Sequence, residues 1–174
     1  MAEIGGGAIA FDARGVATYL VSLRPVLRAA TETRQIWVKR IGVLMADTRR
    51  GNRALIQQQA GQIGREHGNQ FRDVQLMLDR LRVPRECSTC HQELGRWLAM
   101  LVQSCDVLAE IGRDGELKRL QDAQRCLTEA RAHAHAFNAE YARLCDVLRD
   151  HVRTASSRQK DRRASQPRAR RGDT

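Results

Sequence analysis

The sequence predicts an all-α protein folded as an antiparallel, up-down-up-down four-helix bundle. Its commonest residues are helix formers such as Leu, Ala, Arg, Gln and Glu, and the 174 residues include only three prolines and 4% aromatic residues. β-branched residues never form alternating runs of the kind that strands show. Apolar residues instead recur every third or fourth position through four long segments, and each segment needs the others to cover its apolar face.

The first helix is expected over residues 12–46, after a glycine-rich and flexible lead-in at residues 1–11. Pro25 lies inside this apolar period. A proline removes one backbone donor and crowds the carbonyl one turn earlier, so we expect a kink, or a break into two helices near residues 22–24.

A polar loop should separate the first helix from a second one at residues 52–82, with Gly51 as the point of chain reversal. The apolar period of this second helix includes one polar side chain, His67. We interpret His67 as a group that fixes the register of the helices or finds a water partner.

The third helix is expected over residues 85–112, because Pro84 suits a turn or a first helical position. Two glycines and an aspartate then form a stop and restart. We assign Gly112 as the C-terminal cap of the third helix and Asp114 as the N-cap of the fourth.

The fourth helix, residues 115–153, has the most regular apolar stripe in the chain. Folding it back on the third helix with a short turn places Trp97 opposite Ala130 and within a turn of Ala134, with Trp37 near the same level. Small residues facing a large one allow layers to interdigitate. The stripe consists of Leu120, Ala123, Leu127, Ala130, Ala134, Phe137, Tyr141, Leu144, Leu148 and His151.

Residues 154–174 are expected to form a disordered basic tail. The chain has a formal net charge of +10, and residues 153–174 hold eight Arg and Lys against two Asp, a net of +6. This segment lacks the apolar side chains needed to fold alone. Its cations suit phosphates of nucleic acid, anionic lipid or an acidic protein surface, or simply solubilise the chain end. They are Arg158, Lys160, Arg162, Arg163, Arg168, Arg170 and Arg171.

Cysteine usage and the N-terminal sequence favour a cytoplasmic protein. No stretch approaches the roughly 18 consecutive apolar residues of a membrane span. Glu3 stands where a secretory signal carries positive charge, so no signal peptide is expected. Five cysteines, an odd number, fit free thiols in a reducing compartment.

Cys87, Cys90 and His91 form a CxxCH sequence, the most specific local motif in the chain. These five positions resemble the haem-attachment motif of c-type cytochromes, in which two thiols bind the haem and the histidine ligates iron. Zinc is a second interpretation, with Cys145 as the fourth ligand. The simplest interpretation is structural, because Cys87 and Cys90 continue the apolar stripe of the third helix.

The sequence offers no positive case for an enzyme. It contains no phosphate-binding loop, no nucleophile elbow, and no Glu-x-x-His spacing around its five histidines. We therefore expect a non-enzymatic scaffold or protein-interaction module that associates with itself or with another helical protein. The alternatives are a nucleic-acid-associated protein acting through the tail, and a metal- or haem-binding bundle.

Overall fold

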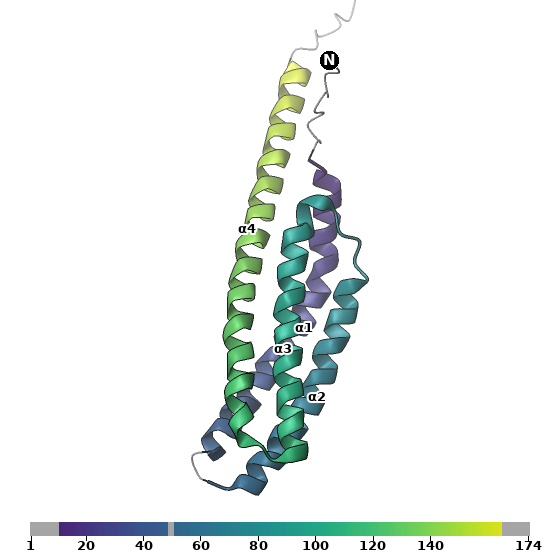
Figure 1. Cartoon of the computed structure of the whole chain (residues 1–174). Coiled ribbons are helices and arrows are strands. Elements are labelled where there is room, and N and C mark those ends of the chain that lie inside the picture. Colours follow the sequence, from purple (N-terminus) through teal and green to yellow (C-terminus); the bar gives the residue numbers. More distant parts are fainter. Residues whose placement is uncertain (1–10, 49–50, 165–174) are drawn as a thin grey trace, which may run out of the picture.

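The computed structural model describes residues 11–48 and 51–164, and these residues form a bundle of four antiparallel α-helices (Figure 1). This confirms the fold class, and no strand occurs in these two ranges. Two short 3₁₀ turns, η1 and η2, precede the third and fourth helices. In chain order the elements are α1 (Ala13–Thr48), α2 (Arg53–Asp79), η1 (Arg85–Cys87), α3 (Ser88–Asp114), η2 (Leu117–Arg119) and α4 (Leu120–Ala164).

Helix α1 is a single helix of 36 residues that continues through Pro25. The expected break near residues 22–24 is therefore wrong. Proline removes only one hydrogen bond from the helix. On either side of it, Leu23 and Val26 are fully buried in the core, so packing holds the helix together across the missing bond.

The start of α2 and the end of α3 are fixed by specific local features. The Asn52 side chain caps α2 by accepting a hydrogen bond from the Leu55 amide, at 3.1 Å. Gly51 has a φ of +77°, as its predicted role in chain reversal requires. Helix α3 ends at Gly115, with a φ of +71°, and not at Gly112. The prediction chose the wrong one of two nearby glycines.

Gly112 has a different role, because α2 and α3 approach each other backbone to backbone. A methyl group added at Gly61 of α2 would lie only 2.8 Å from the Cα atom of Gly112. One turn further along, a methyl group at Gly64 would lie 2.9 Å from the Cα of Ala109. Only glycine, which has no Cβ atom, fits at these positions, so the three glycines allow the backbones of α2 and α3 to come into direct contact.

The core contains the largest apolar side chains of all four helices. Trp37 of α1 packs edge-on against Phe71 of α2, with ring centroids 5.7 Å apart at 89°. His67 is 2% exposed, and its Nε2 lies 3.4 Å from the Arg40 guanidinium, which in turn pairs with Glu66. The predicted polar group in the seam therefore links α2 to α1.

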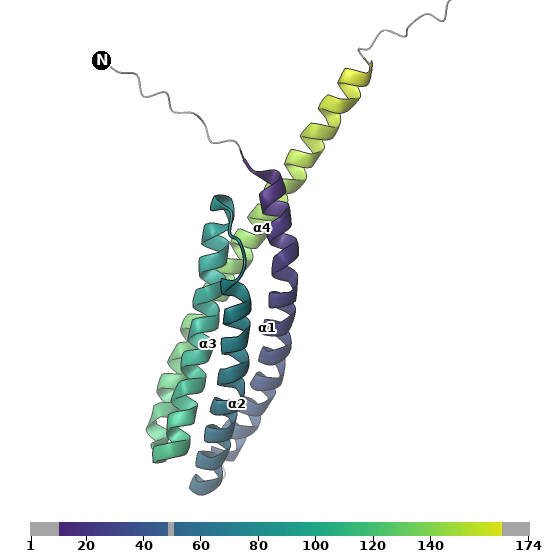
Figure 2. The same ribbon diagram turned by 90° about the vertical axis from the view of Figure 1, so that its right-hand side faces the viewer.

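Helix α4 is 45 residues long and extends past the other helices at its C-terminal end (Figures 1 and 2). The expected helix end at 153 was too early, because residues 154–164 are helical. At the start of this extension Thr154 and Ser157 donate to backbone carbonyls one turn earlier, and Arg153 pairs with Asp150. Residues 165–174 lie outside the described residues.

The helices do not close into a symmetric bundle. Helix α3 packs extensively on both α2 and α4, and α1 packs mainly on α2, but α1 and α4 touch each other very little. Figure 2 shows α4 crossing α1 only near the start of α1. There the Phe11 and His151 rings lie 5.7 Å apart.

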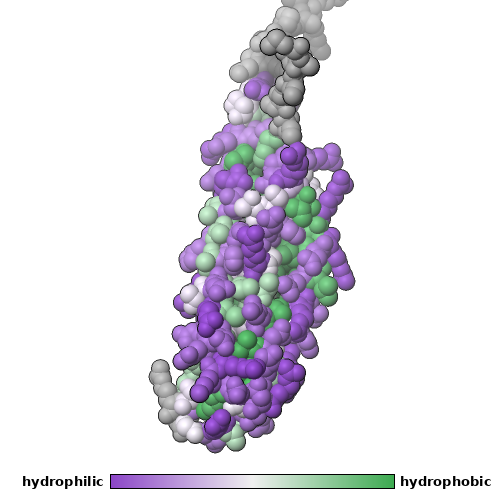
Figure 3. Space-filling view, viewed as in Figure 1, coloured by the Kyte–Doolittle hydropathy of each residue, from purple (hydrophilic) through white to green (hydrophobic). Residues whose placement is uncertain are grey.

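The surface is largely hydrophilic on the face shown in Figure 3, with hydrophobic residues visible in narrow strips between charged ones. Across the described part of the chain, no helix combines the length and apolarity that crossing a membrane requires.

Candidate functional site

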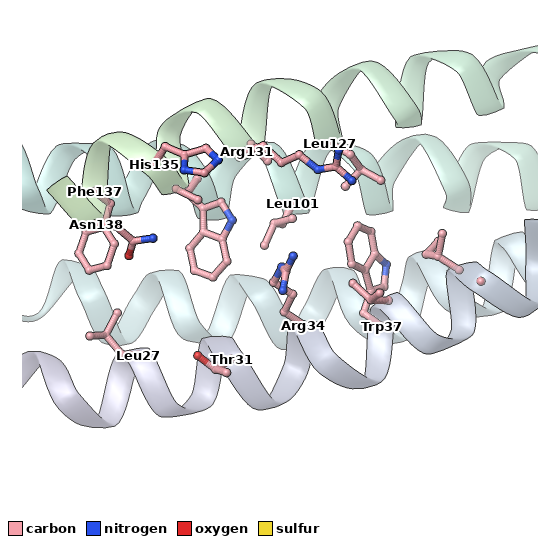
Figure 4. A pocket seen from close by; sticks show the side chains of 16 residues that line it. Leu27, Thr31, Arg34, Trp37, Leu101, Leu127, Arg131, His135, Phe137 and Asn138 are labelled. Carbon is pink, nitrogen blue, oxygen red and sulfur yellow. The ribbon is translucent and has the colours of Figure 1, made fainter.

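The separation of α1 and α4 leaves a groove of about 730 Å³ along the middle of the bundle (Figure 4). Helix α1 forms one wall and α4 the other, while Trp97 and Leu101 of α3 form the floor. Apolar and aromatic side chains make up most of its lining. The lining residues are Leu27, Thr31, Arg34, Trp37, Val38, Ile41, Gly42, Trp97, Leu101, Leu127, Ala130, Arg131, Ala134, His135, Phe137 and Asn138.

The predicted helix register explains where the groove lies. Trp97, Ala130, Ala134 and Trp37 all line it, so the level that sequence spacing gave them is correct. Ala130 and Ala134 are too small to fill the space across from α1, and Trp97 remains only half-buried on the floor. A large ring facing small side chains thus produces an accessible cavity here, where we had expected closed interdigitation.

The groove is positively charged. Arg34 reaches in from α1 and Arg131 from α4, and both lie between Phe137 at one end and Trp37 at the other (Figure 4). The lining contains no Asp or Glu. Neither arginine forms an ion pair with any carboxylate of residues 11–48 or 51–159. His135 is also exposed on the rim of the groove.

Among the described residues, three other arginines, Arg40, Arg72 and Arg119, differ from this pair because each forms an ion pair with a carboxylate of a neighbouring helix. Arg40 of α1 pairs with Glu66 of α2, and Arg72 of α2 pairs with Asp106 of α3. Two unpaired guanidinium groups beside exposed apolar surface therefore leave both charge and apolar area available to a ligand. Sequence reasoning missed these residues, since it treated every helix as fully covered by its neighbours.

The CxxCH residues lie outside the groove, at the end of the bundle where α3 begins. Cys87 and Cys90 are both fully buried, as the structural interpretation predicted. Burial raises the pKa of the Cys87 thiol to about 11 and that of Cys90 to about 12. Cys145 of α4 lies near enough to add to the shift at Cys90, so the three predicted thiols share one region. The raised pKa values keep Cys87 and Cys90 protonated at neutral pH, whereas metal ligands and nucleophiles are thiolates.

His91 has a protein partner already. Its Nδ1 lies 3.3 Å from the Tyr19 hydroxyl, and their rings are 6.1 Å apart. Burial lowers the pKa of His91. As the side chains lie, no group of three or more His, Cys, Asp or Glu in the described part of the chain is arranged to hold a metal ion. A zinc or haem site at Cys87, Cys90 and His91 stays a prediction that needs these side chains to rearrange.

The predicted phosphate-binding cations are only partly described. Arg158 is exposed on the extension of α4. Lys160, Arg162 and Arg163 belong to its last turns, and Arg168, Arg170 and Arg171 lie outside the described residues.

Comparison of the chain with known proteins found no matching family, no matching curated protein and no matching solved structure. Function is therefore inferred from the geometry of the groove and of the C-terminal end of α4.

Proposed function

We propose that the protein is a non-enzymatic interaction module whose binding surface is the groove between α1 and α4. The observation that carries this proposal is the pair of aromatic and apolar walls that have no neighbouring helix to cover them. Every other long side of the bundle packs against an adjacent helix.

A partner that covers the groove would bury apolar surface that is now in contact with water. Trp97 on the floor is half-buried, Leu127 and Ile41 are only partly buried, and Val38 is 46% exposed. Complete burial of one large apolar side chain contributes about 1.5–3 kcal/mol relative to full exposure. A partner that finishes burying four partly covered side chains therefore has several kcal/mol available before the costs of association.

The test blocks the groove with one substitution and compares it with a matched control. Ala134→Glu places a bulky carboxylate in the groove, whereas Ala136→Glu places the same group on an exposed face of the same helix turn. Both variants keep a good helix former and carry the same charge. Tagged wild-type protein and both variants are used to capture proteins from an extract of the source cells, and light scattering measures self-association.

A partner, or a second copy, that binds wild type and Ala136→Glu but not Ala134→Glu supports the proposal. A monomer whose captured proteins are the same for all three forms contradicts it.

A second candidate is nucleic-acid association through the C-terminal segment, and the extension of α4 favours it. This helix carries Arg158 and further cations past the ends of the other three helices (Figures 1 and 2). Contacts to phosphates release counterions, so affinity should fall steeply with salt. Fluorescence anisotropy with a labelled DNA duplex should show binding at low salt that deletion of residues 154–174 abolishes. No binding at low salt, or equal binding after deletion, contradicts it.

A further inference from the structure

We propose that the groove takes an amphipathic α-helix from a partner protein, with acidic side chains beside its apolar stripe. This inference rests on the proposed function and specifies the chemistry of the partner. Helix-in-groove binding needs a long apolar channel with regularly spaced positions for side chains at every third or fourth residue.

The length and shape of the groove fit a helix. Its α1 wall runs from Leu27 to Gly42, which corresponds to about 22 Å, or four helical turns. Phe137 and Leu27 lie toward one end and Trp37 and Leu127 toward the other, with Leu101 between the walls (Figure 4). Apolar contacts are thus distributed along the whole channel, as a stripe of three or four anchors on one helix face requires.

The charges select an acidic partner. Arg34 and Arg131 stand on opposite walls, so they would flank a helix lying between them on both sides. Carboxylates on the flanks of that helix would pair with both guanidinium groups, which have no carboxylate partner among the described residues. A second copy of this chain docked groove to groove would instead bring four arginines together, which disfavours a symmetric dimer.

A small amphiphilic anion shares part of this chemistry, but it fits the shape less well. Pockets for small molecules usually bury 70–90% of the ligand. This groove is open to solvent along its length between α1 and α4, with Arg34, Val38, Arg131 and His135 exposed on its sides. An occupant of that shape is covered on one face only, as a docked helix is.

The experiment uses three capped peptides of about 16 residues, enough for four helical turns. One has leucines at every third or fourth position with glutamates beside them, the second has lysines in place of the glutamates, and the third scrambles the first. Binding is followed by tryptophan fluorescence, since Trp97 lies on the groove floor and the chain has only two tryptophans. Sodium laurate is titrated separately as the small amphiphilic anion.

We expect saturable binding of the acidic peptide alone. Arg34→Glu combined with Arg131→Glu should weaken it about tenfold or more, because two exposed charge pairs become repulsive. Arg28→Glu is the control, since Arg28 is exposed on α1 and lies outside the groove. It should leave the affinity within about twofold. Trp97→Phe should remove most of the fluorescence change.

Equal binding of the lysine or scrambled peptide, or of the double arginine variant, overturns the inference. Laurate binding that depends on the same two arginines, without peptide binding, overturns it in favour of a small-molecule site. If Ala134→Glu prevents binding of a natural partner but the acidic peptide does not bind, the inference of an acidic helix is overturned. The proposal of an interaction module then remains. Failure of both tests removes both proposals.

Discussion

Replacing Gly64 by alanine tests the backbone contact between α2 and α3. The new methyl group would lie 2.9 Å from the Cα atom of Ala109, and closer still to the Ala109 amide nitrogen and the Cys105 carbonyl oxygen. All three are backbone atoms, which have no rotamer by which to move aside. Carbon atoms in ordinary contact are about 3.5–4.0 Å apart, so the two helices must separate by roughly an ångström.

The expected effect is a net loss of stability despite a better helix former. Alanine in place of a helical glycine contributes about 1 kcal/mol in favour of folding. Overpacking a tight interface, including the backbone shifts it forces, typically costs about 1–3 kcal/mol. Since the backbone atoms here cannot rotate aside, the cost should lie at the upper end of that range, and we expect Gly64→Ala to lower the free energy of unfolding by up to about 2 kcal/mol.

Urea unfolding followed by circular dichroism measures this change, with Gly42→Ala as the control. Gly42 is exposed on α1, and an added methyl group there meets no atom within 4 Å. Gly42→Ala should therefore raise the unfolding midpoint, by about 0.5–1 kcal/mol of stability. The two variants should shift the midpoint in opposite directions. If Gly64→Ala is as stable as Gly42→Ala, α2 and α3 do not pack at the distance described.

Three further predictions concern titration, thiol access and a surface network. Burial holds the pKa values of His67 and His91 below the ordinary 6.5, so the unfolded chain takes up protons first as the pH falls. Stability should therefore be full above pH 6.5 and decline below it; a urea midpoint that is flat between about pH 5 and 7.5 would contradict this. Cys90, buried and with its pKa raised to about 12, should react with a thiol reagent at about pH 8 far more slowly than the partly buried Cys145, whereas all thiols should react alike in urea. Arg119 pairs with three carboxylates at the α3–α4 turn, but its side chain is 38% exposed, so Arg119→Ala should lower stability by less than about 1 kcal/mol in the same urea assay.

The fold could be predicted because each helix carries a continuous apolar stripe and the loops are short. That combination fixes which helices are neighbours, and it placed Trp97 correctly beside Ala130 and Ala134. The end of α3 could not be predicted in the same way. Gly112 and Gly115 are equally suited to a cap by residue type, and the choice depends on Gly61, which packs against Gly112 from another helix.

The candidate site could not be predicted from periodicity. The spacing of apolar residues shows that a side chain faces inward, but not whether the opposite helix is near enough to cover it. Arg34 and Arg131 occupy positions beside the stripes, where they look like ordinary solvated charges. The length of α4 was underestimated for a related reason: residues 154–164 continue the helix without any apolar pattern.

The unequal packing of the helices also bears on how the chain folds. The three extensive interfaces join helices that follow one another in sequence, and the first and last helices are not required to meet. Such a topology has short loops to close and a low contact order, which favours rapid folding. It also makes the bundle a linear stack with two terminal members, so α1 and α4 are each anchored on one main side. A terminal helix of this kind can loosen while the central α2–α3 hairpin stays intact, which is how a cooperative domain comes to contain parts of different local stability.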